Sequence, residues 1–196
     1  MKTYRIAITG ISDFMFGKKE TSTRGDNETH DQFTNRVWRE QIHNNNGECF
    51  IQPFAFKNAL ESAARWLSMG IPGEGKKTFT KRFASGILVV DRMPLMNAKG
   101  RPVVVDDVEP LRIFAPSDGK RGSGKRVWRI FPTVHNWNTV AIVHVLDDKI
   151  SEKVLQSHLK AAGQFIGLGS MRVENGGING RFDVTSVEVI QEAVAA

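Results

Sequence analysis

The sequence predicts an α+β fold with a ferredoxin-like β-α-β-β-α-β core and long loop insertions. Residues 3–9 and 182–190, near the two ends of the chain, alternate between apolar and polar side chains as half-buried strands do. Residues 53–67 and 151–166 carry apolar residues at helical spacing, and strand patterns lie between these two segments. The predicted order is therefore strand, helix, strands, helix, strand.

The first strand, expected at residues 3–9, is followed by a long polar segment. Residues 17–47 are rich in Gly, Thr, Asn and charged side chains, and they are too many for an ordinary connection. They predict a functional loop or small insertion. Phe33, Val37 and Trp38 fall at helical spacing and predict one short helix within it.

The first long helix begins at Pro53, a residue favoured in the first helical turn. Its apolar stripe consists of Phe56, Leu60, Ala63, Ala64 and Leu67. Gly70 and Pro72 are expected to end it. Glu61 and Arg65 are spaced for an ion pair on the exposed flank, which also carries Lys57 and Asn58.

Strand patterns occupy the middle of the chain. They are expected at residues 83–91, 103–105 and 127–132, and a nearly continuous apolar run at 139–146 predicts a strand buried on both faces. Residues 73–77 and 117–125 are basic loops. Ser151 can cap the second helix, and a glycine-rich segment, residues 167–181, joins this helix to the last strand.

Composition excludes several classes of protein. No stretch approaches the roughly 18 apolar residues that span a bilayer, and the N-terminus lacks the apolar core of a secretion signal. The one cysteine, Cys49, excludes an internal disulfide and a zinc site of several thiolates. The sequence thus predicts a cytoplasmic protein with no metal, no cofactor and no membrane partner.

Charge is distributed unevenly along the chain. The formal net charge is +6, but residues 76–129 alone hold 13 Lys or Arg and five Asp or Glu, a net of +8. Such a basic region predicts a polyanionic partner, of which nucleic acid is the commonest, or else a solvated face that keeps the protein soluble.

Two near-matches to the nucleotide-binding P-loop are rejected. The segment 119–126 has Arg126 where a Ser or Thr must reach magnesium, and it leads into a strand pattern rather than a helix. The segment 70–77 fails at the same position, and it follows a helix.

The glycine-rich segment suggests anion binding. Its five glycines within fourteen residues would let a polymer backbone approach closely, and Arg172 and Arg181 supply forked donors for phosphates. The alternative is a flexible loop that only turns the chain. A weaker catalytic or metal-binding interpretation rests on Asp26, His30 and Asp31, which could activate a hydroxyl group.

Three segments carry a resemblance to the RAMP superfamily of CRISPR-associated proteins, and within it to the repeating backbone subunit of effector complexes. They are the first strand, the segment 51–60 (IQPFAFKNAL), and one closing region that contains 167–172 (GLGSMR) and 176–184 (GGINGRFDV). The resemblance implies one RRM-like domain over residues 1–196, with insertions at about 17–47 and 92–126. Either the insertion at 17–47 or the loop at 115–126 would act as a thumb.

The resemblance also implies a function. The chain would bind guide RNA (crRNA) through phosphates and sugars, stack on copies of itself along the RNA, and meet complementary target nucleic acid and other effector subunits. The alternative is a RAMP-type endoribonuclease that cleaves target or precursor RNA. Relatives that cleave target RNA use a loop aspartate, for which Asp26 or Asp31 would be the equivalent. The expected RNA-binding residues are Lys57, Asn58, Arg65, Lys76, Lys77, Lys120, Arg121, Lys125, Arg126, Gly167, Gly169, Arg172, Gly177, Gly180 and Arg181.

Overall fold

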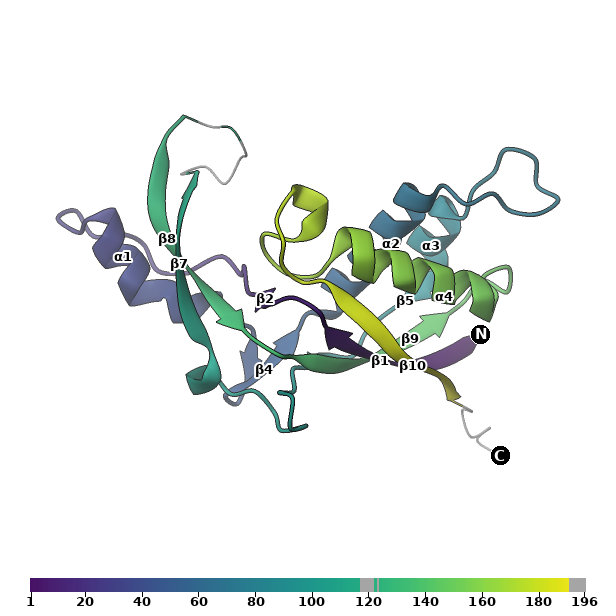
Figure 1. The fold of residues 1–196 in the computed structure, drawn as a ribbon, viewed down its shortest axis with the longest axis horizontal. Coiled ribbons are helices and arrows are strands. Elements are labelled where there is room, and N and C mark those ends of the chain that lie inside the picture. Colours follow the sequence, from purple (N-terminus) through teal and green to yellow (C-terminus); the bar gives the residue numbers. More distant parts are fainter. Residues whose placement is uncertain (117–121, 123, 191–196) are drawn as a thin grey trace.

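A computed structural model describes residues 1–116, 122 and 124–190. Its body is a four-stranded antiparallel sheet in the order β10-β1-β9-β5. Three helices lie over one face of this sheet (Figure 1). The strands are β1 (Lys2–Gly10), β5 (Ile87–Leu88), β9 (Asn138–Val145) and β10 (Phe182–Ile190), and the helices are α2 (Pro53–Leu67), α3 (Thr80–Gly86) and α4 (Glu152–Ala161).

The topology of the body is that of a ferredoxin-like fold. Helix α2 lies between β1 and β5 in the sequence, α4 lies between β9 and β10, and the first strand sits at the centre of the sheet. β1 pairs antiparallel with both β9 and β10 along nearly its whole length. Tyr4, Ile6 and Ile8 of β1 are buried in the core, whereas Arg5 points to the opposite, exposed side. The structure confirms the predicted fold class.

The two predicted helix starts are also confirmed. α2 begins at Pro53 and ends at Leu67, where Ser68 in a left-handed conformation donates its N–H to the Ala64 carbonyl oxygen. α4 follows Ser151, whose Oγ accepts a hydrogen bond from the Val154 N–H at 3.3 Å. A π-helical segment, η3 (Ala162–Ile166), continues α4.

A second sheet forms an arm that projects from the body (Figure 1). Its order is β2-β8-β7, and the helix α1 packs on β8. The Gln41 side-chain amide donates to the Ile130 carbonyl oxygen at 3.3 Å, which ties the insertion at residues 17–47 to the arm. The elements are β2 (Phe14–Met15), α1 (His30–Val37), η1 (Trp38–Gln41), β7 (Glu109–Pro116) and β8 (Arg126–Val134).

A third small sheet, in the order β3-β4-β6, leads from the insertion into α2. Its strands are β3 (Asn44–Asn45), β4 (Glu48–Ile51) and β6 (Met93–Pro94). Two short helical turns lie elsewhere in the chain, η2 (Val105–Asp107) and η4 (Val173–Asn175). Within the described part of the chain, no helix is long and apolar enough to cross a membrane.

Three strand predictions need correction. Residues 83–86 are helical, because Phe79 and Phe83 are spaced for the buried side of α3, and only residues 87 and 88 form a strand. Val105 begins a 3-10 turn rather than continuing a strand. In β9, buried and half-buried residues alternate, since the helices cover only one face of the sheet.

Candidate nucleic-acid interface

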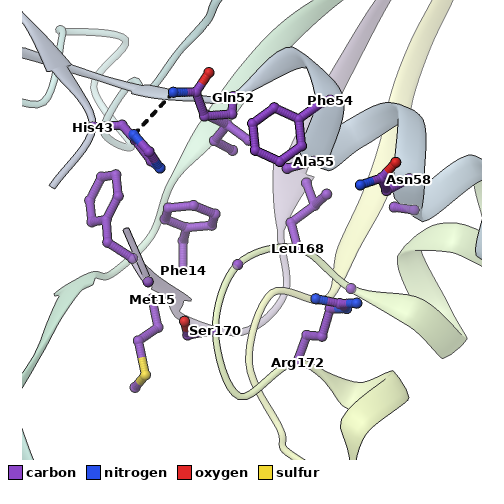
Figure 2. Close-up of a pocket in the computed structure, with 16 residues that line it drawn as sticks. Phe14, Met15, His43, Gln52, Phe54, Ala55, Asn58, Leu168, Ser170 and Arg172 are labelled. Carbon is purple, nitrogen blue, oxygen red and sulfur yellow. Dashed lines mark hydrogen bonds between the residues drawn. The ribbon is translucent and has the colours of Figure 1, made fainter. Parts of the chain in front are cut away.

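Three segments that lie far apart in the sequence meet around one cavity of about 250 Å³. The first consists of residues 14–17 and includes β2. The second is the beginning of α2, and the third is the start of the glycine-rich segment (Figure 2). The cavity lies where the arm joins the body, because β2 belongs to the sheet of the arm while α2 belongs to the body.

The glycine-rich segment is held against β2 by its backbone. The Ser170 N–H donates to the Met15 carbonyl oxygen at 2.8 Å, and the Gly180 N–H donates to the Asp13 carbonyl oxygen at 2.8 Å. Gly169 has a φ of 78°, and a Cβ there would collide with the Met15 carbonyl oxygen. These close approaches require glycine for the packing of this chain's own backbone, so RNA contact by the glycines stays a prediction.

Arg172 is the cation that lines the cavity. Its Nε and Nη2 donate to one carboxylate oxygen of Glu174, at 3.0 and 2.9 Å. The guanidinium is partly exposed, so it is oriented by Glu174 while it remains accessible to a ligand. Asn58 of α2 and Ser170 add a side-chain amide and a hydroxyl group to the same lining.

The N-terminus of α2 also faces the cavity. Gln52 occupies the N-cap position without capping the helix, because its side-chain amide is hydrogen-bonded to Nδ1 of His43 at 3.1 Å (Figure 2). The positive end of a 15-residue helix and the Arg172 guanidinium thus line the same cavity. Burial, and to a lesser degree the charge of Lys18, lowers the pKa of His43, which favours the neutral imidazole.

Aromatic rings form the remaining wall. Phe14 and Phe16 are buried, and their rings contact one another edge to face with centroids 5.0 Å apart. Phe54, in the first turn of α2, is 59% exposed at the rim of the cavity. The lining therefore combines anion-binding groups with an accessible aromatic ring. A nucleotide has the matching chemistry, since its phosphate is an anion and its base has two flat faces.

The other predicted residues of α2 lie outside this cavity. Lys57 pairs with Glu61 and donates to the Ala84 carbonyl oxygen at 3.0 Å, so it is directed towards α3. Arg65 lies further along α2 and donates to the Ser62 hydroxyl at 2.8 Å.

The remaining predicted cations are widely separated. Lys76 and Lys77 lie in the loop that joins α2 to α3, beyond the end of α2 that is distant from the cavity (Figure 1). Lys125 and Arg126 belong to the arm, where the Arg126 guanidinium lies 5.4 Å from the centre of the Phe114 ring. Lys120 and Arg121 lie outside the described residues.

Arg181 is exposed immediately before β10, and its backbone N–H donates to the Ser12 hydroxyl at 3.0 Å. Gly167 lines the cavity beside Gly169, whereas Gly177 packs on the Met171 backbone and Gly180 on Leu168.

The candidate catalytic residues lie on the arm and do not line the cavity. Asp31, in the first turn of α1, pairs with Arg112 of β7 at 2.6 Å, and His30 begins α1. Asp26 is exposed in the loop before this helix. Over residues 1–116, 122 and 124–190, no cluster of three His, Cys, Asp or Glu side chains could hold a metal ion. Burial raises the pKa of Cys49 to about 11, so it is a neutral thiol.

Sequence reasoning missed several residues of the cavity. Phe14, Phe16 and His43 come from segments without helical or strand periodicity, and β2 is only two residues long. Phe54 lies two residues before Phe56, and composition alone does not show which of the two is buried. The exposed position of Phe54 follows from the phase of the apolar stripe, which begins at Phe56.

The chain was compared with family models, curated proteins and solved structures. No family model matches the sequence, and neither does any curated protein. The structure is similar to that of a CRISPR protein from Archaeoglobus fulgidus, with a TM-score of 0.39 and 13% sequence identity. The similarity covers 97% of this chain and 65% of the other. Such values establish neither a shared fold nor a shared function or partner.

Proposed function

We propose that this protein binds single-stranded RNA, with one nucleotide of the strand in the cavity between β2, α2 and the glycine-rich segment. The observation that carries the proposal is the convergence of the α2 N-terminus, the Arg172 guanidinium and the exposed Phe54 ring on one lining. A helix N-terminus and an arginine both favour a phosphate group, and an exposed ring favours a base.

The expected contacts imply little sequence preference. Arg172 and the first turn of α2 would contact phosphate oxygens, while Asn58 and Ser170 are placed to bond sugar hydroxyl groups. Phe54 would stack on any base, because every base has a flat aromatic face. The strand would be recognised through its backbone and its single-stranded state.

We further propose that the RNA is a guide RNA and that copies of this chain line up along it in a CRISPR-type ribonucleoprotein effector complex. The resemblance of residues 51–60 and of the glycine-rich segment to RAMP backbone subunits supports this proposal. Both of these regions contribute to the cavity. Complementary target nucleic acid and other effector subunits would be the further partners.

Filter binding with labelled oligouridylate tests RNA binding. Arg172→Ala should weaken binding roughly tenfold and reduce the slope of log affinity against log salt by about one, since one phosphate contact is lost. Glu174→Gln should strengthen binding by about threefold, because the carboxylate that competes for Arg172 becomes neutral.

Arg5→Ala is the matched control. It also removes one arginine with a glutamate partner, Glu188, but from the sheet face opposite the helices. Equal affinity for the Arg172→Ala variant, the Arg5→Ala variant and the unmodified protein would show that the cavity binds no phosphate and would overturn the proposal.

A further inference from the structure

An exposed pair of stacked aromatic rings lies beyond the cavity. The rings of Trp66 and Phe165 are parallel to within 13°, with centroids 4.1 Å apart. Trp66 is 57% exposed and Phe165 is 42% exposed, although burying both would gain more free energy than leaving them in water. Neither ring has a role in the cavity described above.

The local backbone fixes the position of this pair. Trp66 belongs to the last turn of α2, and Phe165 belongs to the π-helical segment that continues α4. A Cβ at Gly163 would collide with the Phe182 carbonyl oxygen, so glycine allows this segment to lie directly against β10. π-helical turns often occur at functional sites, and here the turn brings Phe165 onto the Trp66 ring.

One ridge of α2 connects the pair with the cavity. Phe54, Asn58, Ser62 and Trp66 follow one another at intervals of four residues and form a continuous row along the helix. Phe54 and Trp66 are twelve residues apart, which is about 18 Å along the helix axis. A single strand with about 3.4 Å between successive stacked nucleotides would cover this distance with roughly five nucleotides.

The ion pair between Arg172 and Glu174 lies between the cavity and the aromatic pair, with one residue at each. The hollow beside the aromatic pair is lined by Ser62, Arg65, Trp66, Phe165, Val173 and Glu174. Glu174 accepts the two hydrogen bonds from Arg172, and Arg172 lines the cavity. The Arg65 side chain is more than half exposed and adds a second cation on the same side of α2.

We propose that Trp66 and Phe165 form a second stacking platform, which takes a base of the same RNA strand several nucleotides away from the cavity. This inference rests on the proposed RNA binding. The exposed residues Phe54, Asn58 and Trp66 of this row, the half-exposed Arg65 side chain and the exposed aromatic pair match a sugar-phosphate strand with its bases turned towards the protein. With Phe54 at one end and Trp66 at the other, α2 would fix the number of nucleotides between the two stacked bases.

The test compares Trp66→Leu, Phe165→Leu and Trp66→Phe, each with a dinucleotide and with an oligouridylate long enough to reach both sites. The leucine variants should lose about tenfold in affinity for the long RNA and nothing for the dinucleotide. Trp66→Phe keeps a flat ring and should retain most of the affinity. Val90→Ala, at an exposed apolar residue outside both sites, is the control.

Arg172→Ala separates this inference from the proposed function. It should weaken both RNAs, so a loss with Arg172→Ala and none with Trp66→Leu would overturn the second platform alone. The Trp66→Leu variant could instead keep its RNA affinity and show altered self-association in sedimentation. That result would assign the aromatic pair to a protein contact and would also overturn the second platform. Far-UV circular dichroism of each variant verifies folding.

The fluorescence of Trp66 gives a second test, and it requires no substitution of Trp66 or Phe165. Trp38 and Trp137 are buried, so Trp128→Phe leaves Trp66 as the single exposed tryptophan. The long RNA should quench its emission, and the dinucleotide should not. Emission that the long RNA leaves unchanged would contradict stacking on Trp66.

Discussion

Several side chains owe their protonation state to the groups packed around them. His158 is fully buried, with its ring 4.0 Å from that of Phe83 and its Nδ1 2.7 Å from the Val154 carbonyl oxygen. Its Nε2 has no hydrogen-bond partner among the described residues. Burial therefore lowers the pKa of His158, although the bond to Val154 opposes the shift.

We predict that His158 makes the protein less stable as the solution becomes acidic. The unfolded chain binds a proton at this residue near pH 6.5, whereas the folded chain resists protonation until the pH reaches its lowered pKa. The free energy of unfolding should fall across this interval by up to about 1.4 kcal/mol per pH unit from this group.

Urea unfolding at a series of pH values, for the unmodified protein and for His158→Phe, measures this contribution. The variant keeps a flat ring against Phe83 and should show a smaller loss of stability below pH 6.5. Identical pH profiles for the two proteins would show that His158 is protonated equally in the folded and unfolded chains.

His135 behaves in the opposite way. Its Nδ1 lies 2.7 Å from Asp13 and its Nε2 lies 3.5 Å from Glu109. The hydrogen bond with Asp13 raises the pKa of His135, so its stabilising contribution is complete below about pH 6.5 and is lost as the pH rises through the raised value. Through Glu109 and Asp13, the His135 side chain links β7 and the end of β8 to the loop that follows β1.

At the scale of elements, the glycine-rich segment acts as a fixed part of the cavity. Two backbone hydrogen bonds join it to residues 13–15, and its start is buried. Its apex, residues 174–176, is exposed. Because the buried start lies directly against β2, side chains added there must displace backbone rather than solvent.

Gly169→Ala should therefore destabilise the protein by about 2 kcal/mol and weaken RNA binding as well. The substitution forces alanine into a left-handed conformation and against the Met15 carbonyl oxygen. Gly100→Ala is the control, because Gly100 has a similar φ of 72° but open space around it, and it should cost only about 1 kcal/mol.

Urea unfolding measures the two free energies, and filter binding measures the effect on RNA. Equal stability losses for the two variants would mean that β2 and the glycine-rich segment move apart without cost.

For the whole molecule, a compact body carries α2, α3 and α4, and an arm projects from it (Figure 1). The cavity is lined by residues from both parts, whereas the candidate stacking surface of α2 lies on the body. Among the described cations of this basic region, Lys76 and Lys77 lie in the loop between α2 and α3 on the body, whereas Arg112, Arg126 and Arg129 lie on the strands of the arm. This distribution suits a strand that continues past one copy of the chain towards the next, as the proposed guide-RNA subunit requires.

We predict that several copies bind to one RNA, in numbers that rise with its length. Sedimentation of the protein with an oligouridylate, and with RNAs twice and four times as long, should show a stepwise increase in bound chains. Arg172→Ala should reduce occupancy at every length. One bound chain per RNA, whatever its length, would contradict the guide-RNA backbone function while leaving RNA binding itself intact.

Much of the fold was predictable because its signals are local. Pro53 and Ser151 mark the starts of α2 and α4 through rules that involve only neighbouring residues, and the central β1 has clear alternation. The segment at 83–91 was misjudged in part, since a short apolar run fits both a helix turn and a strand. The choice between them depends on packing against α2.

By itself, the sequence determined the first and last strands, the helices α2 and α4 with their starting residues, and the presence of a basic region. Only the tertiary structure decided which residues share a cavity, because Phe14, His43, Phe54 and Arg172 approach one another through the pairing of β2 with β8 and the packing of α2 on the sheet. Periodicity and capping act over a few residues, whereas a binding site is made by contacts between residues far apart in the chain.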